Sequence, residues 1–205
     1  LALPTGGRLA VSTDAHVVSP LFFPGGDIGR LAVCGTVNDV AMLGAQPHSL
    51  TAAFILEEGL ELETLGRVVA SMQAAAVEAG VSIVAGDTKV VGRGEAGGLY
   101  LVAAGVGVRP RGLRLGVGEV HSGDALLVSG SVGDHGTAVL LAREEFGLRG
   151  DLASDAASVL PLAQALLGVP GLRFMRDPTR GGLATVVHEI VRASGAPKGS
   201  VYHFF

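Results

Sequence analysis

The alternation of strand and helix patterns along the 205 residues predicts a mixed α/β (α+β) fold, in which a mixed sheet is backed by helices. Short apolar runs bounded by turn residues are typical of strands, and longer runs with helical spacing separate them. A stretch rich in Arg and Gly, residues 109–123, predicts a hinge to a second, partial α/β domain. We therefore predict domains at residues 1–112 and 113–195, followed by a tail at 196–205. The predicted strands of the first domain are Leu9 to Ser12, Leu50 to Leu56, Val81 to Ala85 and Leu99 to Val108.

The composition excludes several classes of protein. Hydrophobic residues make up 48% and charged residues 17%, so a substantial core can be buried. The formal net charge of −4 argues against binding to nucleic acids or to membrane surfaces. The single cysteine, Cys34, excludes an intrachain disulfide and a cysteine metal cluster. It falls in a predicted helix, where we expect a buried core residue. No apolar run is long enough to span a bilayer, so we expect a cytoplasmic protein.

The first helix is predicted between Pro24 and Pro47. Asp27 can cap its start, because an aspartate oxygen accepts from free N–H groups of the first turn. Gly44 suits the position after its end, where a left-handed backbone is favoured. Asn38 and Asp39 interrupt its apolar face. Gly35 lies one turn before Asp39 and is expected to leave room for a ligand beside that carboxylate.

Two further acidic residues follow predicted strands. Asp14 comes after the first strand, and Gly86-Asp87-Thr88-Lys89 is expected to be the turn that leaves the strand ending at Ala85. Carboxylates suit Mg²⁺, and a lysine suits a polyphosphate. These residue types therefore indicate a site for a divalent cation with phosphates. The alternative is that the aspartates are solvated or turn residues and that Lys89 lies on the surface.

The remaining elements carry two more candidate residues. A core helix is predicted from about Glu61 to Ala79, with Gly80 as its end. In the second domain, a strand at Ala125 to Ser129 leads into a Gly-rich turn with His135, a geometry that can hold an anion at a helix start. A helix is expected at Ala156 to Leu167. Residues 177–182 form a loop with Arg180 and open a helix from Leu183 to Ala193. Arg180 can bind phosphate oxygens or pair with Asp177. His135 can be an acid–base group or a structural turn residue.

The amino-acid sequence of these stretches resembles the HypE family of hydrogenase maturation proteins, within the aminoimidazole ribonucleotide (AIR) synthetase-like superfamily. The motifs are SPLFFPGGDIG, GTVND, GDTKV, GDHG and DPTRGGLA, in order over residues 6–195. The resemblance implies a PurM/AIR synthetase-like N-terminal domain, followed by part of the superfamily's C-terminal domain. It also implies ATP and Mg²⁺ as cofactors and a homodimer whose sheets pair. The implied activity is the ATP-dependent dehydration of a carbamoylated C-terminal cysteine to a thiocyanate, with HypF and the HypC–HypD complex as partners.

The resemblance also assigns roles to residues. Asp14, Asp39 and Asp87 are expected near the metal, with Asn38 supporting them. Gly86, Thr88 and Arg180 are expected to contact the nucleotide together with Asn38 and Asp87. Lys89 and His135 are expected to be catalytic, with Lys89 stabilising developing charge or assisting proton transfer.

Both ends of the chain depart from the family pattern. An acidic Asp-Asp motif before the first strand and a C-terminal cysteine are absent, and the last ten residues resemble part of a TetR-type repressor. We therefore expect a fragment with a foreign tail to which no DNA-binding role is assigned. The alternatives are another ATP-using member of the superfamily, such as a thiamine-phosphate kinase or a selenophosphate synthetase, and a non-catalytic dimeric module.

Overall fold

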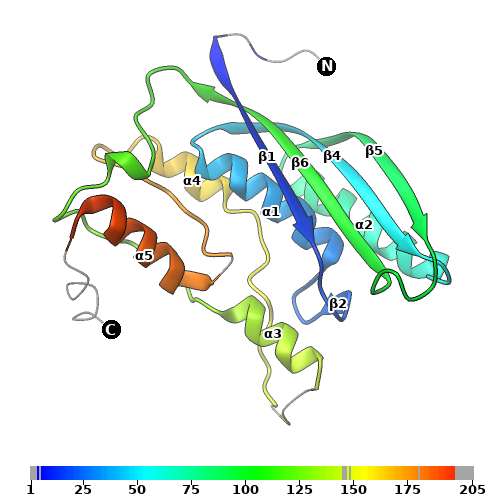
Figure 1. Cartoon of the computed structure of the whole chain (residues 1–205). Coiled ribbons are helices and arrows are strands. Elements are labelled where there is room, and N and C mark those ends of the chain that lie inside the picture. Colours follow the sequence, from blue (N-terminus) through cyan, green and yellow to red (C-terminus); the bar gives the residue numbers. More distant parts are fainter. Residues whose placement is uncertain (1–3, 5, 145–146, 148, 180, 197–205) are drawn as a thin grey trace.

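The computed structural model describes residues 4, 6–144, 147, 149–179 and 181–196. Its centre is a four-stranded sheet in the order β1-β6-β4-β5 (Figure 1). β6 runs antiparallel to both β1 and β4, whereas β4 and β5 are parallel, so the predicted mixed sheet is confirmed. The strands are β1 (Gly7–His16), β4 (Gln46–Glu57), β5 (Ser82–Val91) and β6 (Leu99–Pro110).

Two strands are longer than the sequence predicts. β1 continues through Asp14 to His16, so Asp14 lies within the strand and not after it. β5 continues through Gly86 to Val91, so the predicted turn at residues 86–89 is wrong. The pairing with β4 explains the second difference, since it extends to Glu57 opposite Val91. A ladder of this length holds Gly and Asp extended, although both are uncommon in strands.

Two helices cover one face of the sheet and form the core with it. These are α1 (Ile28–Met42) and α2 (Leu62–Glu78), which lie behind the sheet in Figure 1. Both predicted ends of α1 are confirmed: Asp27 caps its start, and Gly44 follows its end with φ at 71°. The predicted core role of α2 is also confirmed, because Val68 and Met72 are buried against α1 and the sheet.

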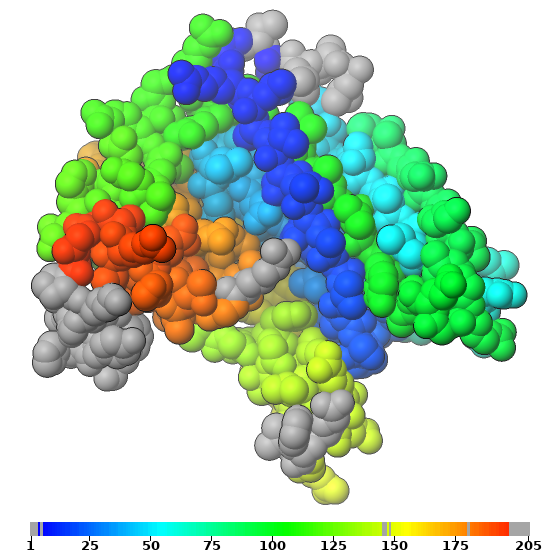
Figure 2. All heavy atoms as spheres, viewed as in Figure 1, coloured from blue at the N-terminus to red at the C-terminus, as the bar shows by residue number. Residues whose placement is uncertain are grey.

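The opposite face of the sheet is turned toward the viewer in Figures 1 and 2, and none of the described elements covers it. Leu9 and Val11 of β1 are 62% and 61% exposed there. The register places them beside Val108 and Val106 of β6, which are half-buried. The chain therefore presents an apolar sheet surface, which we call the open face.

Beyond β6 the described chain contains short helices joined by segments without regular structure. They are η1 (Val117–Glu119), α3 (Asp134–Ala142), α4 (Leu160–Leu166) and α5 (Gly182–Ser194). The predicted strand at Ala125 to Ser129 is wrong: the segment has no regular secondary structure, and no described residue pairs with it to form a ladder. The Gly-rich turn into α3 and the helix after residue 181 are confirmed.

The helix predicted at Ala156 to Leu167 begins only at Leu160. The side chain of Asn38 explains the late start, because it donates to the carbonyl of Ala157 and accepts from the N–H of Val159. These contacts hold residues 157–159 outside the helix, and Pro161 in the first turn favours a helix start there. A small hairpin, β2 (Phe22–Phe23) with β3 (Gly26–Asp27), precedes α1.

Candidate functional site

Asp14 and Asp39 lie together between β1 and α1. The Asp39 Oδ2 accepts a hydrogen bond of 2.7 Å from the Ser12 hydroxyl on β1. The Asp14 Oδ2 lies 3.4 Å from Nε2 of His16, which is buried. Asp14 shares the helix-covered face of the sheet, since it is paired with the buried Ala103. Two of the three predicted metal carboxylates therefore come from neighbouring elements.

Gly35 contributes to this arrangement differently from the prediction. A Cβ at this position would lie 3.1 Å from Cε1 of His16 and 3.5 Å from Oδ2 of Asp14. The space beside the glycine is thus occupied by His16 and not free for a ligand. The lack of a side chain lets β1 approach α1 closely, which holds the imidazole beside the Asp14 carboxylate.

A third carboxylate, missed at the sequence level, approaches this pair from the second half of the chain. Burial raises the pKa of Asp177, and the negative charges of Asp39 and Asp14 raise it further. Both carboxylate oxygens are buried, and among the described residues neither has a hydrogen-bond partner; the Arg176 Nη1 lies 3.7 Å from Oδ1. The DPTRGG motif contains this residue, but the motif by itself predicts only a pairing of Asp177 with Arg180. Arg180 itself lies outside the described residues.

Asp87 and Lys89 lie far from this group within one chain. The register pairs them with Ala53 and Ile55 of β4, which share a face with Val102 and Tyr100 of β6. That is the open face, whereas Asp14 lies on the helix-covered face. In addition, β1 and β5 are opposite edges of the sheet, three strand spacings or about 14 Å apart. One chain therefore does not bring the three predicted metal ligands together.

The other two predicted nucleotide contacts on β5 alternate with these residues. Gly86 pairs with Ala52 and Thr88 pairs with Phe54, so both face the helix side of the sheet. A Cβ on Gly86 would lie 2.5 Å from the Ala52 carbonyl oxygen. The glycine is therefore required for the close approach of β5 to β4, independently of any ligand.

His135 lies on α3 near the hairpin β2–β3. Its Nδ1 is 3.0 Å from the Ser154 hydroxyl, and its ring packs edge-on against Phe23 with centroids 5.2 Å apart. Burial lowers the pKa of the imidazole, and the charge of Asp155 opposes that shift. The lowered pKa favours the neutral imidazole, which can accept a proton.

The donor set fits Mg²⁺ in chemical type. In the described ranges, no three His, Cys, Asp or Glu side chains are grouped as metal ligands. Mg²⁺ does not require such a group, because it keeps several waters and is usually bound by one or two carboxylates plus substrate phosphates. Asp14 and Asp39 meet that requirement. Cys34 does not contribute, since it is buried and burial raises the pKa of its thiol to about 11.

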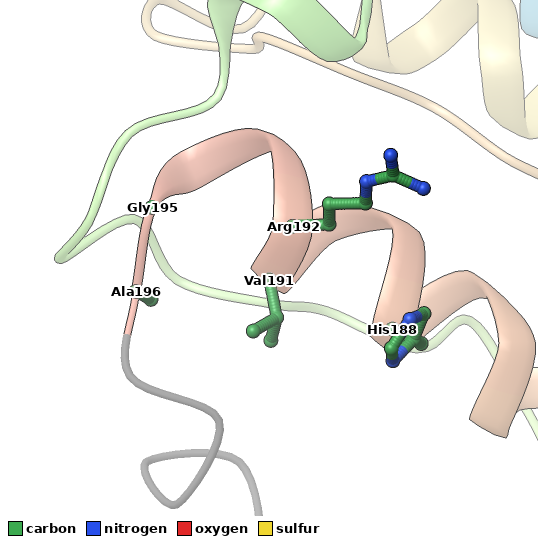
Figure 3. A pocket seen from close by; sticks show the side chains of 5 residues that line it. All are labelled: His188, Val191, Arg192, Gly195 and Ala196. Atoms are coloured by element: carbon green, nitrogen blue, oxygen red, sulfur yellow. The ribbon is translucent and has the colours of Figure 1, made fainter.

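A separate hollow lies at the end of α5 and contains none of the predicted site residues. It is lined by His188, Val191, Arg192, Gly195 and Ala196 (Figure 3). It is formed by one helix and the residues that follow it, so we assign no chemistry to it. Within the described part of the chain, no helix has the length and apolar character needed to cross a membrane.

Comparisons with known proteins identify both halves of the chain. The family model described as "AIR synthase related protein, N-terminal domain" matches residues 1–109, and the corresponding C-terminal domain model matches residues 121–196. The carbamoyl dehydratase HypE of Cupriavidus necator is 55% identical over 195 residues, which are 95% of this chain and 56% of the relative. The chain thus spans about half the length of the curated relatives that it matches.

Solved structures agree with these matches. A crystal structure of HypE in complex with ATP is 50% identical, with a TM-score of 0.89 over 94% of this chain and 58% of that one. A HypE–HypF complex is 49% identical, with a TM-score of 0.88 over 95% and 64%. Thiamine monophosphate kinase from Aquifex aeolicus is 20% identical, with a TM-score of 0.70 over 95% and 66%, a likeness that shows the fold alone.

Proposed function

Because the chain belongs to the AIR synthase related protein family and matches HypE carbamoyl dehydratases at about half of all positions, we propose that it binds Mg-ATP in hydrogenase maturation. The proposed reaction is the ATP-dependent dehydration of a carbamoylated cysteine to a thiocyanate. The observation that carries this proposal is the acidic group between β1 and α1. There Asp39 is held by Ser12, and Asp14 lies beside His16.

Asp14 and Asp39 would hold Mg²⁺ in this proposal. When bound, Mg²⁺ would neutralise charge on the polyphosphate. The Ser12 hydroxyl keeps one Asp39 oxygen in place by donating to it, which leaves the other oxygen to face a cation. Asp177 would add a third negative charge when the second half of the chain lies against α1, as it does in this structure.

A second copy of the chain would complete the site. The open face is apolar, with Leu9 and Val11 well exposed, and both β1 and β5 are edge strands. Pairing of the two copies along these edges would bury part of this surface and could bring β5 of one copy beside β1 of the other, at the edge that Asp14 reaches from the helix-covered face. Asp87 and Lys89 of the second copy would then join Asp14 and Asp39. This proposal accounts for the division of the predicted ligands between two edges.

The remaining predicted residues have the following proposed roles. Lys89 would stabilise negative charge on the transferring phosphoryl group, and Gly86, Thr88 and Arg180 would contact phosphates. His135 would move a proton, since its neutral imidazole is already held by Ser154. We also propose a cytoplasmic location and HypF and the HypC–HypD complex as partners. A solved HypE–HypF complex of a 49% identical relative supports the first of these partners.

Calorimetric titration of the dimer with Mg-ATP tests the proposed site. We expect Asp39→Asn and Asp87→Asn to weaken binding at least tenfold each, which corresponds to about 1.4 kcal/mol. Asp151→Asn is the matched control, because Asp151 is exposed and is not one of the residues placed in the site. Unchanged affinity of Asp39→Asn would refute the proposed metal position.

Mixing the two variants tests whether the site is shared between copies. After exchange of subunits, heterodimers contain one site with both native aspartates, so about a quarter of all sites should recover native affinity. If each chain held a complete site, mixing would restore none. Val11→Asp should separate the dimer in sedimentation experiments, because a carboxylate would be buried on the open face.

A further inference from the structure

Residues 153–159, which we call the strap, directly precede α4 and run beside α1 in Figure 1. They contain no helix or strand, and their residues alternate between exposed and half-buried up to Ser158. A segment without regular structure needs other partners for its backbone groups. The strap finds these partners on α1 and on the loop before it.

Two side chains of α1 hold the C-terminal half of the strap. Asn38 donates from Nδ2 to the Ala157 carbonyl at 3.0 Å and accepts at Oδ1 from the Val159 N–H at 2.9 Å. Arg30 donates from Nε to the Ala156 carbonyl at 2.8 Å. The amide of Asn38 thus binds two backbone groups of the strap, one through its nitrogen and one through its oxygen. This role differs from the predicted contact with a nucleotide.

The N-terminal half of the strap is fixed by the loop before α1 and by α3. The Ser154 N–H donates to the Pro24 carbonyl at 2.8 Å. Gly25 has φ at 87°, and a Cβ there would lie 2.6 Å from the Ser154 nitrogen, so only glycine permits this approach. The Ser154 hydroxyl lies 3.0 Å from Nδ1 of His135. The strap therefore forms a continuous connection from Asn38 to the imidazole.

We propose that Asn38 is a positioning residue, which holds the strap so that Ser154 fixes the orientation of the His135 ring. The relevance of this arrangement to catalysis rests on the proposed function of His135. Asn38 suits the task because one amide supplies a donor and an acceptor to two backbone groups that lie two residues apart. An aspartate would lack the donor for Ala157, and an alanine would lack both groups.

Nuclear magnetic resonance of the histidine side chains in the nucleotide-free protein tests the proposal. The signal of His135 among the six histidines is identified by its loss in His135→Gln. In Asn38→Ala we expect that signal to shift and the pKa of the imidazole to rise toward its ordinary value of 6.5, because the ring loses part of its burial. Ser154→Ala should shift the same signal with Asn38 intact.

Ser71→Ala is the matched control. The Ser71 hydroxyl, on α2, donates to Asp27 at the start of α1, so its removal weakens the α1–α2 contact while the hydrogen bonds of Asn38 and Ser154 stay in place. It should lower the melting temperature and leave the His135 signal in place. If Asn38→Ala does not fold, Asn38→Asp replaces it and should shift the signal less, since the acceptor for Val159 remains.

An unchanged His135 signal in a folded Asn38 variant would overturn the proposal. The measurement needs no nucleotide, so it stands apart from the proposed function. Failure of the wild-type chain to bind Mg-ATP would refute the nucleotide site, whereas the His135 signal alone decides the role of Asn38.

Discussion

Replacement of Asp27 by alanine should destabilise the protein without affecting nucleotide binding. The Asp27 Oδ1 accepts from the N–H groups of Gly29 and Arg30, at 2.7 and 3.1 Å, and Oδ2 accepts from the Ser71 hydroxyl at 2.5 Å. Loss of an N-cap costs about 1 kcal/mol, and a hydrogen bond to a charged group contributes about 1.5 kcal/mol or more. The free energy of unfolding should therefore fall by about 2–3 kcal/mol. In a chain of this length each kcal/mol shifts the melting temperature by roughly 2–4 °C.

Urea denaturation followed by circular dichroism measures this change, and Asp27→Asn is its control. Asparagine is as good an N-cap as aspartate, but it places an NH2 group where Oδ2 accepts from Ser71, so Asp27→Asn should keep the cap and lose only the charged hydrogen bond, about 1.5 kcal/mol. Both variants should bind Mg-ATP like the wild type. A loss below about 0.5 kcal/mol in Asp27→Ala would refute the capping role. A weaker affinity of Asp27→Asn for Mg-ATP would instead identify Asp27 as a ligand of the site.

Two further changes test the acidic group directly. Gly35→Ala should gain about 1 kcal/mol of helix propensity. Its Cβ would press on His16, so the affinity for Mg-ATP should fall by up to about tenfold. Unchanged affinity in calorimetry would show that the position of Asp14 does not depend on this contact. Asp177→Asn should stabilise the protein at pH 7, because the raised pKa of Asp177 means that its charged form is disfavoured in the folded state. In urea denaturation this gain should disappear as the pH falls through the folded-state pKa toward the ordinary value of 3.8, and a gain that is independent of pH would contradict the assigned cause.

The part of the fold that depends on local sequence signals could be predicted. Asp27 and Gly44 define the ends of α1 because caps act on groups within a few residues, and the apolar spacing of α2 identifies its buried face. Asp87 could not be placed in the same way. Its local sequence favours a turn, but the parallel pairing with β4 extends the strand through it. Such pairing depends on residues more than thirty positions away, and no local pattern reports it.

The site shows the same division between local and distant signals. The motifs identify Asp14, Asp39 and Asp87 as residues of one chemistry, but they do not say on which face or edge of the sheet each lies. The contacts of Asn38 with Ala157 and Val159 join positions 119 and 121 residues apart, and they use backbone groups that no side-chain pattern reveals. For the same reason Asp177 was missed, since its carboxylate belongs to the group only because the second half of the chain packs against the first.

The position of Asp87 has a consequence for the whole assembly. A sheet has two faces, and a residue on one face cannot reach a ligand on the other without passing around an edge. Asp14 and Asp87 occupy different faces and opposite edges, so any site that uses both must contain strands from two chains. Dimerisation would then be a condition for Mg-ATP binding and not merely a source of stability. If Val11→Asp yields a folded monomer that still binds Mg-ATP with wild-type affinity, Asp87 is not part of the site. If the monomer folds and binding is lost, the two copies share it.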